Sequence, residues 1–161
     1  MRESIYLETT VVSYYTSKPS RDIIVLAHQE ITREWWGTAL KRYDAFISEI
    51  VVEEALAGDP EAARKRAGIL KKIPHLDLNP AVERMAQVYV ERLNIPPKAL
   101  RDAVHLAVAS VHDVDYLVTW NCSHIANGEI IRKLMQVNIA YGIKTPVICT
   151  PEELMPKTKG E

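Results

Sequence analysis

Short apolar segments alternate along the chain with longer segments in which apolar residues recur every three to four positions. The short segments predict strands, because they are apolar runs of strand length bounded by turn residues. Those expected strands lie at 4–8, 44–48, 75–78, 116–119 and 146–150. The longer segments predict helices at 23–40 (divided at Gly37), 50–57, 60–72, 80–93, 98–112 and 124–141, with a short one at 151–154.

This alternation of strands and helices favours an α/β fold around a mainly parallel sheet. In such sheets, binding sites form beyond the carboxyl ends of the strands, where the strand order reverses. The residues that directly follow strands are therefore the first candidates for chemistry. We expect one domain over residues 1–155, with 156–161 as a frayed tail.

Composition narrows the class of protein. The 161 residues are 47% hydrophobic and 25% charged, with 20 Lys+Arg against 21 Asp+Glu and a net charge of −1. This balance excludes a disordered chain and argues against nucleic-acid binding through bulk positive charge, so any such contact has to be local. Cys122 and Cys149 form no C-x-x-C pair, which argues against a zinc ribbon. No signal-peptide or membrane-length apolar run is found, so we expect a cytoplasmic protein without a membrane partner.

Polar groups that follow strands or open helices are the candidate chemical groups. Glu8 and Asn121 follow strands, whereas Glu54 and Asp102 lie in the first turns of helices. Singly, the helical acids could serve the helix dipole, or Asp102 could pair with Lys98. If all four converge, three carboxylates and an amide form an oxygen site suited to Mg²⁺ or Mn²⁺, as in metal-dependent phosphoryl chemistry.

Four segments resemble, in order, the signature blocks of the PIN domain. The family has a strand ending L-D-T, an S-x-x-x-x-x-E block with Gly four residues on, D-A-x-H-x-A-x-A, and a strand ending L-x-T-x-D. The resembling segments are I-Y-L-E-T-T (5–10), S-E-I-V-V-E-E-A-L-A-G (48–58), R-D-A-V-H-L-A-V-A (101–109) and D-Y-L-V-T-W-N (115–121). With the closing P-V-I-C-T-P-E-E-L (146–154), the match runs through nearly the whole chain.

The resemblance implies a three-layer α/β/α sandwich with a five-stranded sheet in the order 3-2-1-4-5. It places Glu8 and Asn121 side by side at the switch point, facing Glu54 and Asp102. Proteins of this family are metal-dependent ribonucleases, and many small members are VapC-like toxins that form homodimers and are inhibited by an antitoxin. The implied function is hydrolysis of RNA by metal-activated water, with Glu8, Glu54, Asp102 and Asn121 around Mg²⁺ or Mn²⁺.

Two residues depart from the family pattern, because Glu8 and Asn121 stand where the family usually has Asp. An amide ligates through its oxygen but brings no charge, so we expect a single weakly held ion and reduced activity. The alternative is a catalytically weak or inactive PIN fold that binds RNA or a protein. A Mg²⁺ phosphatase fits less well, because it requires an Asp nucleophile after the first strand.

Several neighbours of these residues are candidates for supporting roles. Thr9 and Thr119 are potential hydrogen-bond partners of the acids, while His124 and Arg101 are candidate phosphate contacts, with helix capping as the alternative for His124. His105 is interpreted as a core histidine bonded to backbone, with a D-x-x-H metal pair as its alternative. The basic residues of 64–66 and 71–72 are interpreted as a solvated helix face. Trp35 and Trp36 cannot both face inward, so one of them is a candidate for a dimer or antitoxin surface, with packing of both under loops as the alternative.

Overall fold

The computed structural model describes residues 1–157, in which five short strands form one parallel sheet. Their order, β3-β2-β1-β4-β5, confirms the expected order and places the first and fourth strands side by side. In the register of this central pair, Leu7 lies opposite Val118. The strands are β1 (Ser4–Leu7), β2 (Asp44–Ser48), β3 (His75–Leu76), β4 (Tyr116–Val118) and β5 (Val147–Cys149).

Within residues 1–157, seven α-helices connect and cover the strands of this sheet. Several begin at a polar cap: Asp59 precedes Pro60 at the start of α4, and the Asp59 side chain accepts a hydrogen bond from the Ala62 N–H. The helices are α1 (Thr9–Thr16), α2 (Ile23–Thr38), α3 (Glu49–Ala55), α4 (Pro60–Leu70), α5 (Pro80–Arg92), α6 (Leu100–Val111) and α7 (Gly128–Ala140).

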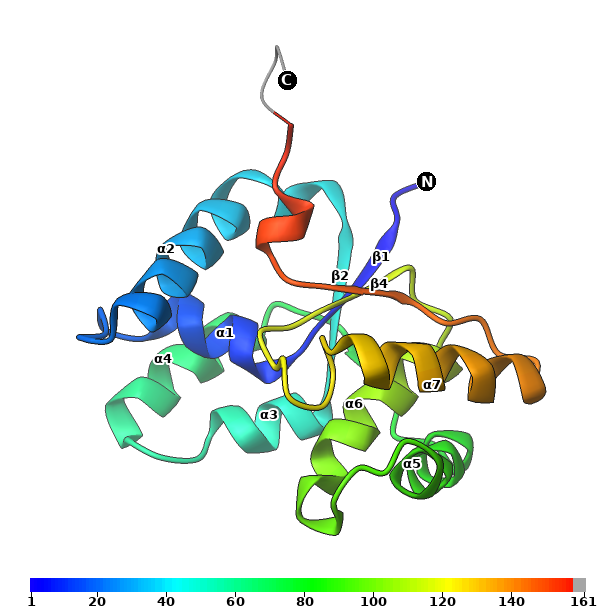
Figure 1. Cartoon of the computed structure of the whole chain (residues 1–161). Coiled ribbons are helices and arrows are strands. Elements are labelled where there is room, and N and C mark those ends of the chain that lie inside the picture. The colour runs from blue at the N-terminus through cyan, green and yellow to red at the C-terminus, as the bar shows by residue number, and fades with distance from the viewer. Residues whose placement is uncertain (158–161) are drawn as a thin grey trace.

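The helices form two groups around the sheet (Figure 1). Helix α1 contacts α2, α3 and α4, whereas α5 contacts α6 and α7. Right-handed crossovers place the β1-to-β2 and β2-to-β3 connections on one face of the sheet and the later connections on the other. The result is the expected three-layer α/β/α arrangement, with the buried side chains of β1 and β4 at its centre.

Three local expectations were wrong. Residues 9–16 form the helix α1, which was not expected because the segment T-T-V-V-S-Y-Y-T is rich in β-branched and aromatic residues of low helix propensity. Burial of Val11 and Val12 overrides that propensity. Gly37 does not divide α2, since one helical glycine costs only about 1 kcal/mol. Helix α7 begins at Gly128 rather than at residue 124, because Asn127 caps it.

Two expectations concern the chain ends and membranes. Of the tail expected to be frayed (156–161), residues 158–161 lie outside the described residues. Among the residues described, none of the helices is both long and apolar enough to span a bilayer.

The start of β1 is attached to the start of β4 through Asp115. Its Oδ2 accepts hydrogen bonds from the backbone N–H of Ser4 at 2.8 Å and from the Ser4 hydroxyl at 3.1 Å, and Lys144 donates to its Oδ1 at 3.3 Å. The bond from the Ser4 backbone is the largest influence that lowers the pKa of Asp115 below its ordinary value of 3.8. The ionised carboxylate therefore stabilises the junction between the two central strands.

Asp115→Asn is expected to lower the free energy of unfolding by about 1 kcal/mol at pH 7. Because the folded-state pKa is depressed, the contribution of the ionised group is complete above the unfolded pKa and disappears as the pH falls through the folded value. Urea unfolding of both proteins from pH 7 to pH 2 measures this, and the two stabilities should converge in acid. A constant difference over that range would show that the carboxylate charge plays no part.

Candidate metal centre

Glu8 connects the end of β1 to the start of α1. As the N-cap of α1 it is only 3% exposed, which requires that its carboxylate be satisfied inside the protein. Oε1 accepts hydrogen bonds from the backbone N–H of Thr10 at 3.2 Å, from the Thr10 hydroxyl at 2.5 Å and from the Thr119 hydroxyl at 2.6 Å. All three bonds go to one oxygen, so Oε1 is held in place while Oε2 accepts none of the hydrogen bonds found within residues 1–157.

Glu54, near the end of α3, is held in a similar way. Its Oε1 accepts a hydrogen bond from the Thr9 hydroxyl at 2.8 Å and lies 2.6 Å from Nε2 of His105. Burial acts to raise the pKa of this carboxyl, but the bonds from His105 and Thr9 and the nearby charge of Arg101 outweigh burial, so the pKa lies below its ordinary value of 4.5. Glu54 is therefore a carboxylate at neutral pH, and Nε2 of His105 is the donor to it.

The other ring nitrogen of His105 continues this network into the core. Nδ1 lies 2.8 Å from the Tyr6 hydroxyl, which lies 2.7 Å from the hydroxyl of Ser48. Burial raises the pKa of the Tyr6 phenol, so the hydroxyl stays protonated and can donate. His105, Tyr6 and Ser48 are all fully buried. They link the first two strands and α6 to Glu54, and a network of this kind orients a ligating side chain.

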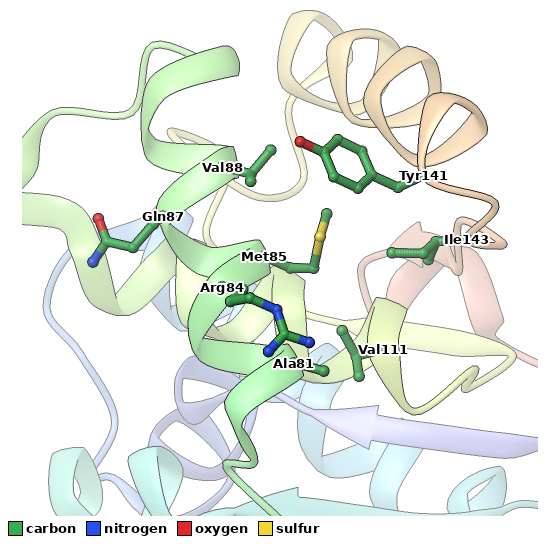
Figure 2. A pocket seen from close by; sticks show the side chains of 8 residues that line it. All are labelled: Ala81, Arg84, Met85, Gln87, Val88, Val111, Tyr141 and Ile143. Carbon is green, nitrogen blue, oxygen red and sulfur yellow. The ribbon is translucent and has the colours of Figure 1, made fainter.

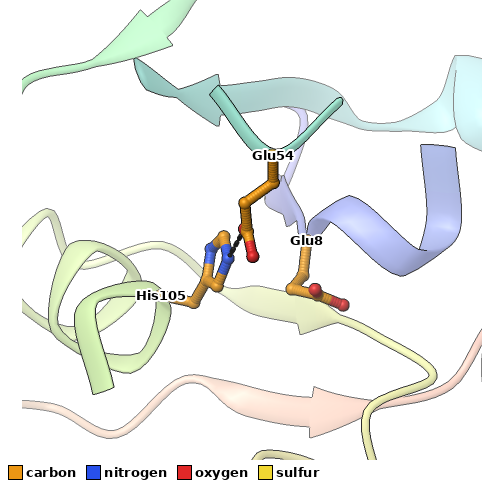
Figure 3. Close-up of side chains that lie close together, drawn as sticks. All are labelled: Glu8, Glu54 and His105. Carbon is orange, nitrogen blue, oxygen red and sulfur yellow. Dashed lines mark hydrogen bonds and ion pairs between the residues drawn. The ribbon is translucent and has the colours of Figure 1, made fainter. Parts of the chain in front are cut away.

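Figure 3 shows Glu8, Glu54 and His105 converging from three separate elements. One potential ligand atom of each residue lies within 4.8 Å of the others. Each carboxylate has one oxygen occupied by protein donors, whereas neither second oxygen accepts any hydrogen bond found in the described part of the chain. Two oriented carboxylates with available oxygens fit a hard divalent cation that keeps several of its waters. Since both nitrogens of His105 are engaged, we assign this residue to orienting Glu54.

Asp102 lies one turn before His105 on α6 but is outside that three-residue cluster. Its Oδ2 pairs with Nδ1 of His124 at 2.8 Å, and both side chains are partly exposed, at 19% and 29% respectively. Residues three apart on a helix face the same side, so the Cβ atoms of Asp102 and His105 are about 5–6 Å apart. At that separation Asp102 is suited to contact a hydrated ion at its solvent side.

Asn121 follows β4, as expected, but its side chain serves the turn that comes next. Oδ1 accepts hydrogen bonds from the backbone N–H groups of Ser123 and His124, at 3.2 and 3.1 Å. Its own N–H donates to the hydroxyl of Thr119, which in turn donates to Glu8. The structure therefore connects the backbone of Asn121 to Glu8 through Thr119, while the side-chain oxygen of Asn121 serves the turn.

The supporting residues are distributed unevenly around the cluster. Thr9 and Thr119 donate to the acids, as the sequence suggested for hydroxyls beside buried carboxylates. His124 precedes α7, so it is not on a helix. Its side chain pairs with Asp102. Arg101 is half-exposed, with a guanidinium nitrogen 3.8 Å from Glu53. His105 is in the core, but its expected bond to backbone was wrong, because its partners are the side chains of Glu54 and Tyr6.

Sequence reasoning missed Tyr6, Ser48 and Thr10 as members of this site. Tyr6 is a buried strand residue in the sequence pattern, and such a position usually indicates packing alone. Ser48 ends β2 much as Glu8 directly follows β1. This shared position at a strand end was the signal that could have indicated Ser48. The alignment of strand ends in the sheet is what turns these positions into neighbours.

A mostly apolar hollow of the described protein lies elsewhere (Figure 2). It measures about 650 Å³ and is bounded by α5, the end of α6 and the segment that follows α7. The residues that line it are mostly apolar and include none of the acids of the candidate centre: Ala81, Arg84, Met85, Gln87, Val88, Val111, Tyr141 and Ile143. The candidate chemistry is therefore at the sheet edge and not in this apolar hollow.

Comparisons with known proteins bear on the fold. Neither a family model nor a curated protein sequence matches this chain. The structure is similar to one chain of the crystal structure of VapBC2 from Rickettsia felis bound to a DNA fragment from their promoter, with a TM-score of 0.57 and 15% sequence identity. The match covers 91% of this chain and 97% of the other. Together with the strand order β3-β2-β1-β4-β5, this likeness shows that the chain has a PIN-like α/β fold.

Proposed function

We propose that the protein is a metal-dependent endoribonuclease and the toxin of a VapBC-like pair. The observation that carries this proposal is the pair of carboxylates, Glu8 and Glu54, each held through one oxygen by protein donors and each with its second oxygen available. They lie at the carboxyl edge of the central strands, where α/β sheets bind their ligands. The likeness to a chain of the VapBC2 structure supports the same function, as do the four sequence blocks.

Glu8, Glu54 and Asp102 would hold one Mg²⁺ or Mn²⁺, with Asn121 contributing from the end of β4. When bound, such an ion lowers the pKa of water and neutralises charge on the phosphodiester. Thr10 and Thr119 hold Glu8, while Thr9 and His105 hold Glu54, so that the two carboxylates are oriented before the ion binds. Hydrolysis with inversion at phosphorus would leave a 5′-phosphate and a 3′-hydroxyl.

The Asp102–His124 pair gives this site a second polar group on its solvent side. His124 is partly exposed and is oriented through Nδ1, so Nε2 is the nitrogen that can face substrate. We propose that it contacts a phosphate of the RNA, together with Arg101, whose side chain is about half exposed. On the same resemblance, we propose that the protein is cytoplasmic, forms a homodimer and is inhibited by an antitoxin.

The second candidate is a PIN-fold binding module for RNA or a protein, with weak or no catalysis. Asn121 favours it, since the amide replaces an acid of the family pattern and its Oδ1 already accepts two backbone hydrogen bonds. A pure binding module would still bind its partner when Asp102 is replaced by a neutral residue, whereas a nuclease would no longer cleave RNA.

We expect Asp102→Asn to abolish cleavage of a mixed structured RNA pool that the parent protein cuts with Mn²⁺ or Mg²⁺ and not with chelator. The loss follows because the neutral amide neither attracts the cation nor pairs in the same way with His124. Gel separation of end-labelled RNA measures cleavage, and analysis of the new ends tests the mechanism. A 2′,3′-cyclic phosphate at those ends would refute hydrolysis by metal-activated water.

Asp113→Asn is a suitable control for this substitution. Asp113 follows α6 at the end opposite Asp102, its side chain is 70% exposed, and the change removes the same charge. The control should cleave like the parent protein. Equal cleavage by parent, control and Asp102→Asn would point to a contaminating nuclease, and no cleavage by any of them would favour the binding module.

A further inference from the structure

Two hollows on the surface beside α1 join into one groove that the proposed function does not yet use. One measures about 340 Å³ and the other about 560 Å³, and they share Tyr15, Gly68 and Ile69. The first extends to Trp36 and Lys72, and the second to Arg33 and Lys65. We call this surface, between the end of α1, α2 and α4, the α1–α4 groove.

Helix α4 supplies the floor of the groove as a single stripe. Lys65, Gly68 and Ile69 follow the i, i+3, i+4 spacing of one helical face, and Lys72 lies in the turn that follows the end of α4. Gly68 lies between the two lysines, and a Cβ at this position would meet nothing within 4 Å, so packing does not require the glycine. A glycine inside a helix costs about 0.5–1 kcal/mol relative to alanine, and here it keeps the floor open.

The charges on the groove are all positive. Lys65 and Lys72 are exposed, and neither forms an ion pair with any described residue. Arg33 pairs with Glu30 and donates to the carbonyl of Ser17, which holds its guanidinium at the groove wall. No acidic side chain lines either hollow within residues 1–157. Because Glu30 pairs with Arg33, Lys65 and Lys72 carry the positive charge that the groove offers to a ligand.

An aromatic pair forms the opposite wall. The rings of Tyr15 and Trp36 are stacked with their centroids 4.3 Å apart and their planes 10° apart, and both are partly exposed. This arrangement assigns Trp36 to the groove, whereas Trp35 is fully buried in the core. Aromatic faces beside a track of cations are the features by which proteins bind single-stranded nucleic acid without reading its sequence.

Helix α1 connects the groove to the candidate metal centre. Glu8 and Thr9 stand at its start in that centre, and Tyr15 and Thr16 stand at its end in the groove. Eight helical residues span about 12 Å, so a strand of nucleic acid at the metal centre could continue along α1 into the groove. Figure 1 shows α1 between α3, next to the sheet edge, and the start of α2.

We propose that the α1–α4 groove binds the single-stranded RNA that flanks the phosphodiester at the metal centre. This proposal rests on the proposed ribonuclease function and names where its substrate lies. Phosphates would pair with Lys65 and Lys72, and a base would stack against the Tyr15–Trp36 pair. RNA fits better than an acidic peptide, since it supplies both the regular negative charges and the flat rings that the two walls complement.

Charge reversal at the floor tests the groove. A short fluorescein-labelled single-stranded RNA is titrated in chelator, so that binding is measured without cleavage. We expect Lys65→Glu with Lys72→Glu to weaken binding at least about tenfold and to reduce the slope of log affinity against log salt by about 1.4, for two lost phosphate contacts. Thermal unfolding checks that the variant is folded.

The control is Arg64→Glu with Lys71→Glu. These exposed residues have the same spacing of seven and change the net charge equally, but neither lines the groove. The control should bind RNA within about threefold of the parent protein. If both variants lose RNA affinity equally, the effect is one of long-range charge and the groove assignment is overturned. Unchanged RNA binding by the groove variant would also overturn it.

A second substitution avoids any change of charge. Gly68→Leu places a side chain on the open floor without a close neighbour to displace, and leucine favours the helix. It should weaken RNA binding while leaving the protein at least as stable as the parent. If a poly-glutamate peptide displaces the labelled RNA as effectively as unlabelled RNA of equal charge, the groove is instead assigned to a protein partner.

Different measurements would refute the groove proposal and the ribonuclease proposal. Lack of metal-dependent cleavage by the parent protein would refute the ribonuclease. Binding that does not depend on Lys65, Lys72 and Gly68 would refute the groove and leave cleavage intact.

Discussion

Glu8→Gln is expected to reduce metal-dependent RNA cleavage at least about 100-fold while leaving the fold intact. Oε1 of Glu8 accepts three hydrogen bonds from Thr10 and Thr119, and a glutamine oxygen can accept the same three. The second oxygen, however, becomes an amide nitrogen that carries no charge and cannot bind a cation. Loss of residues that only orient metal ligands costs 10–100-fold, so loss of a ligand should cost more.

The unfolding temperature separates this effect from damage to the structure. Glu8 is 3% exposed, so replacing its buried charge by a neutral amide should leave stability unchanged or raised. Mn²⁺ should raise the unfolding temperature of the parent protein, because it binds only the folded state, and should have little effect on the variant.

Glu53→Gln is the control for this experiment. Glu53 is an exposed neighbour of Glu54 on α3, and the one ion pair that it forms with residues 1–157 is a 3.8 Å contact with Arg101. The control should keep cleavage within about threefold of the parent and keep the response to Mn²⁺. Full activity of Glu8→Gln would remove Glu8 from the metal centre, whereas a large loss of stability would assign it to the fold.

His105→Ala is expected to lower the free energy of unfolding by about 3 kcal/mol. The imidazole is fully buried between Glu54 and Tyr6, at 2.6 and 2.8 Å, so its removal leaves two polar groups without a partner and opens a cavity. Glu54 is about a quarter exposed, so water recovers part of that loss. Urea unfolding at pH 7 measures the difference.

The same variant changes the acid dependence of stability. Without His105 the pKa of Glu54 should rise, because the bond from the imidazole is the largest of the influences that oppose burial. In the parent protein the stability due to ionised Glu54 is present above pH 4.5 and is lost as the pH falls through the lower folded value. In the variant this loss should be smaller and should be complete at a higher pH.

Tyr6→Phe provides a graded comparison with His105→Ala. It removes only the hydroxyl between Ser48 and His105, so it should cost about 1–2 kcal/mol and leave the bond from His105 to Glu54 in place. The acid limb of its stability curve should stay near that of the parent. Equal effects of the two substitutions on the acid limb would show that His105 does not act on Glu54 directly.

Much of the fold was predictable because local pattern and tertiary structure agree. Each expected strand exists, although β3 has only two residues, and caps such as Asp59 with Pro60 marked a helix start in the sequence itself. The failures are positions where burial or a side-chain cap outweighs propensity. Helix α1 forms from poor helix formers because it buries Val11 and Val12, and α7 starts late because Asn127 caps it.

The candidate site was predictable in part, for a similar reason. Glu8 stood out because an acid directly after a buried strand needs partners, and the structure supplies them through Thr10 and Thr119. Asn121 also follows a strand, but its side-chain oxygen accepts hydrogen bonds from the backbone of the next turn. Its share in metal binding remains a prediction, as does that of Asp102, which pairs with His124 outside the three-residue cluster.

The sequence by itself determined the α/β class, the approximate element boundaries and the small set of acids at strand ends, because these follow from periodicity and from the cost of burying charge. Only the tertiary structure decided which partners each acid has. Tyr6, Ser48, Glu54 and His105 are separated by up to 99 residues, and no local pattern records their contact. The same is true of the groove, where Tyr15 and Trp36 meet Lys65 and Lys72 only because α1 packs against α2 and α4.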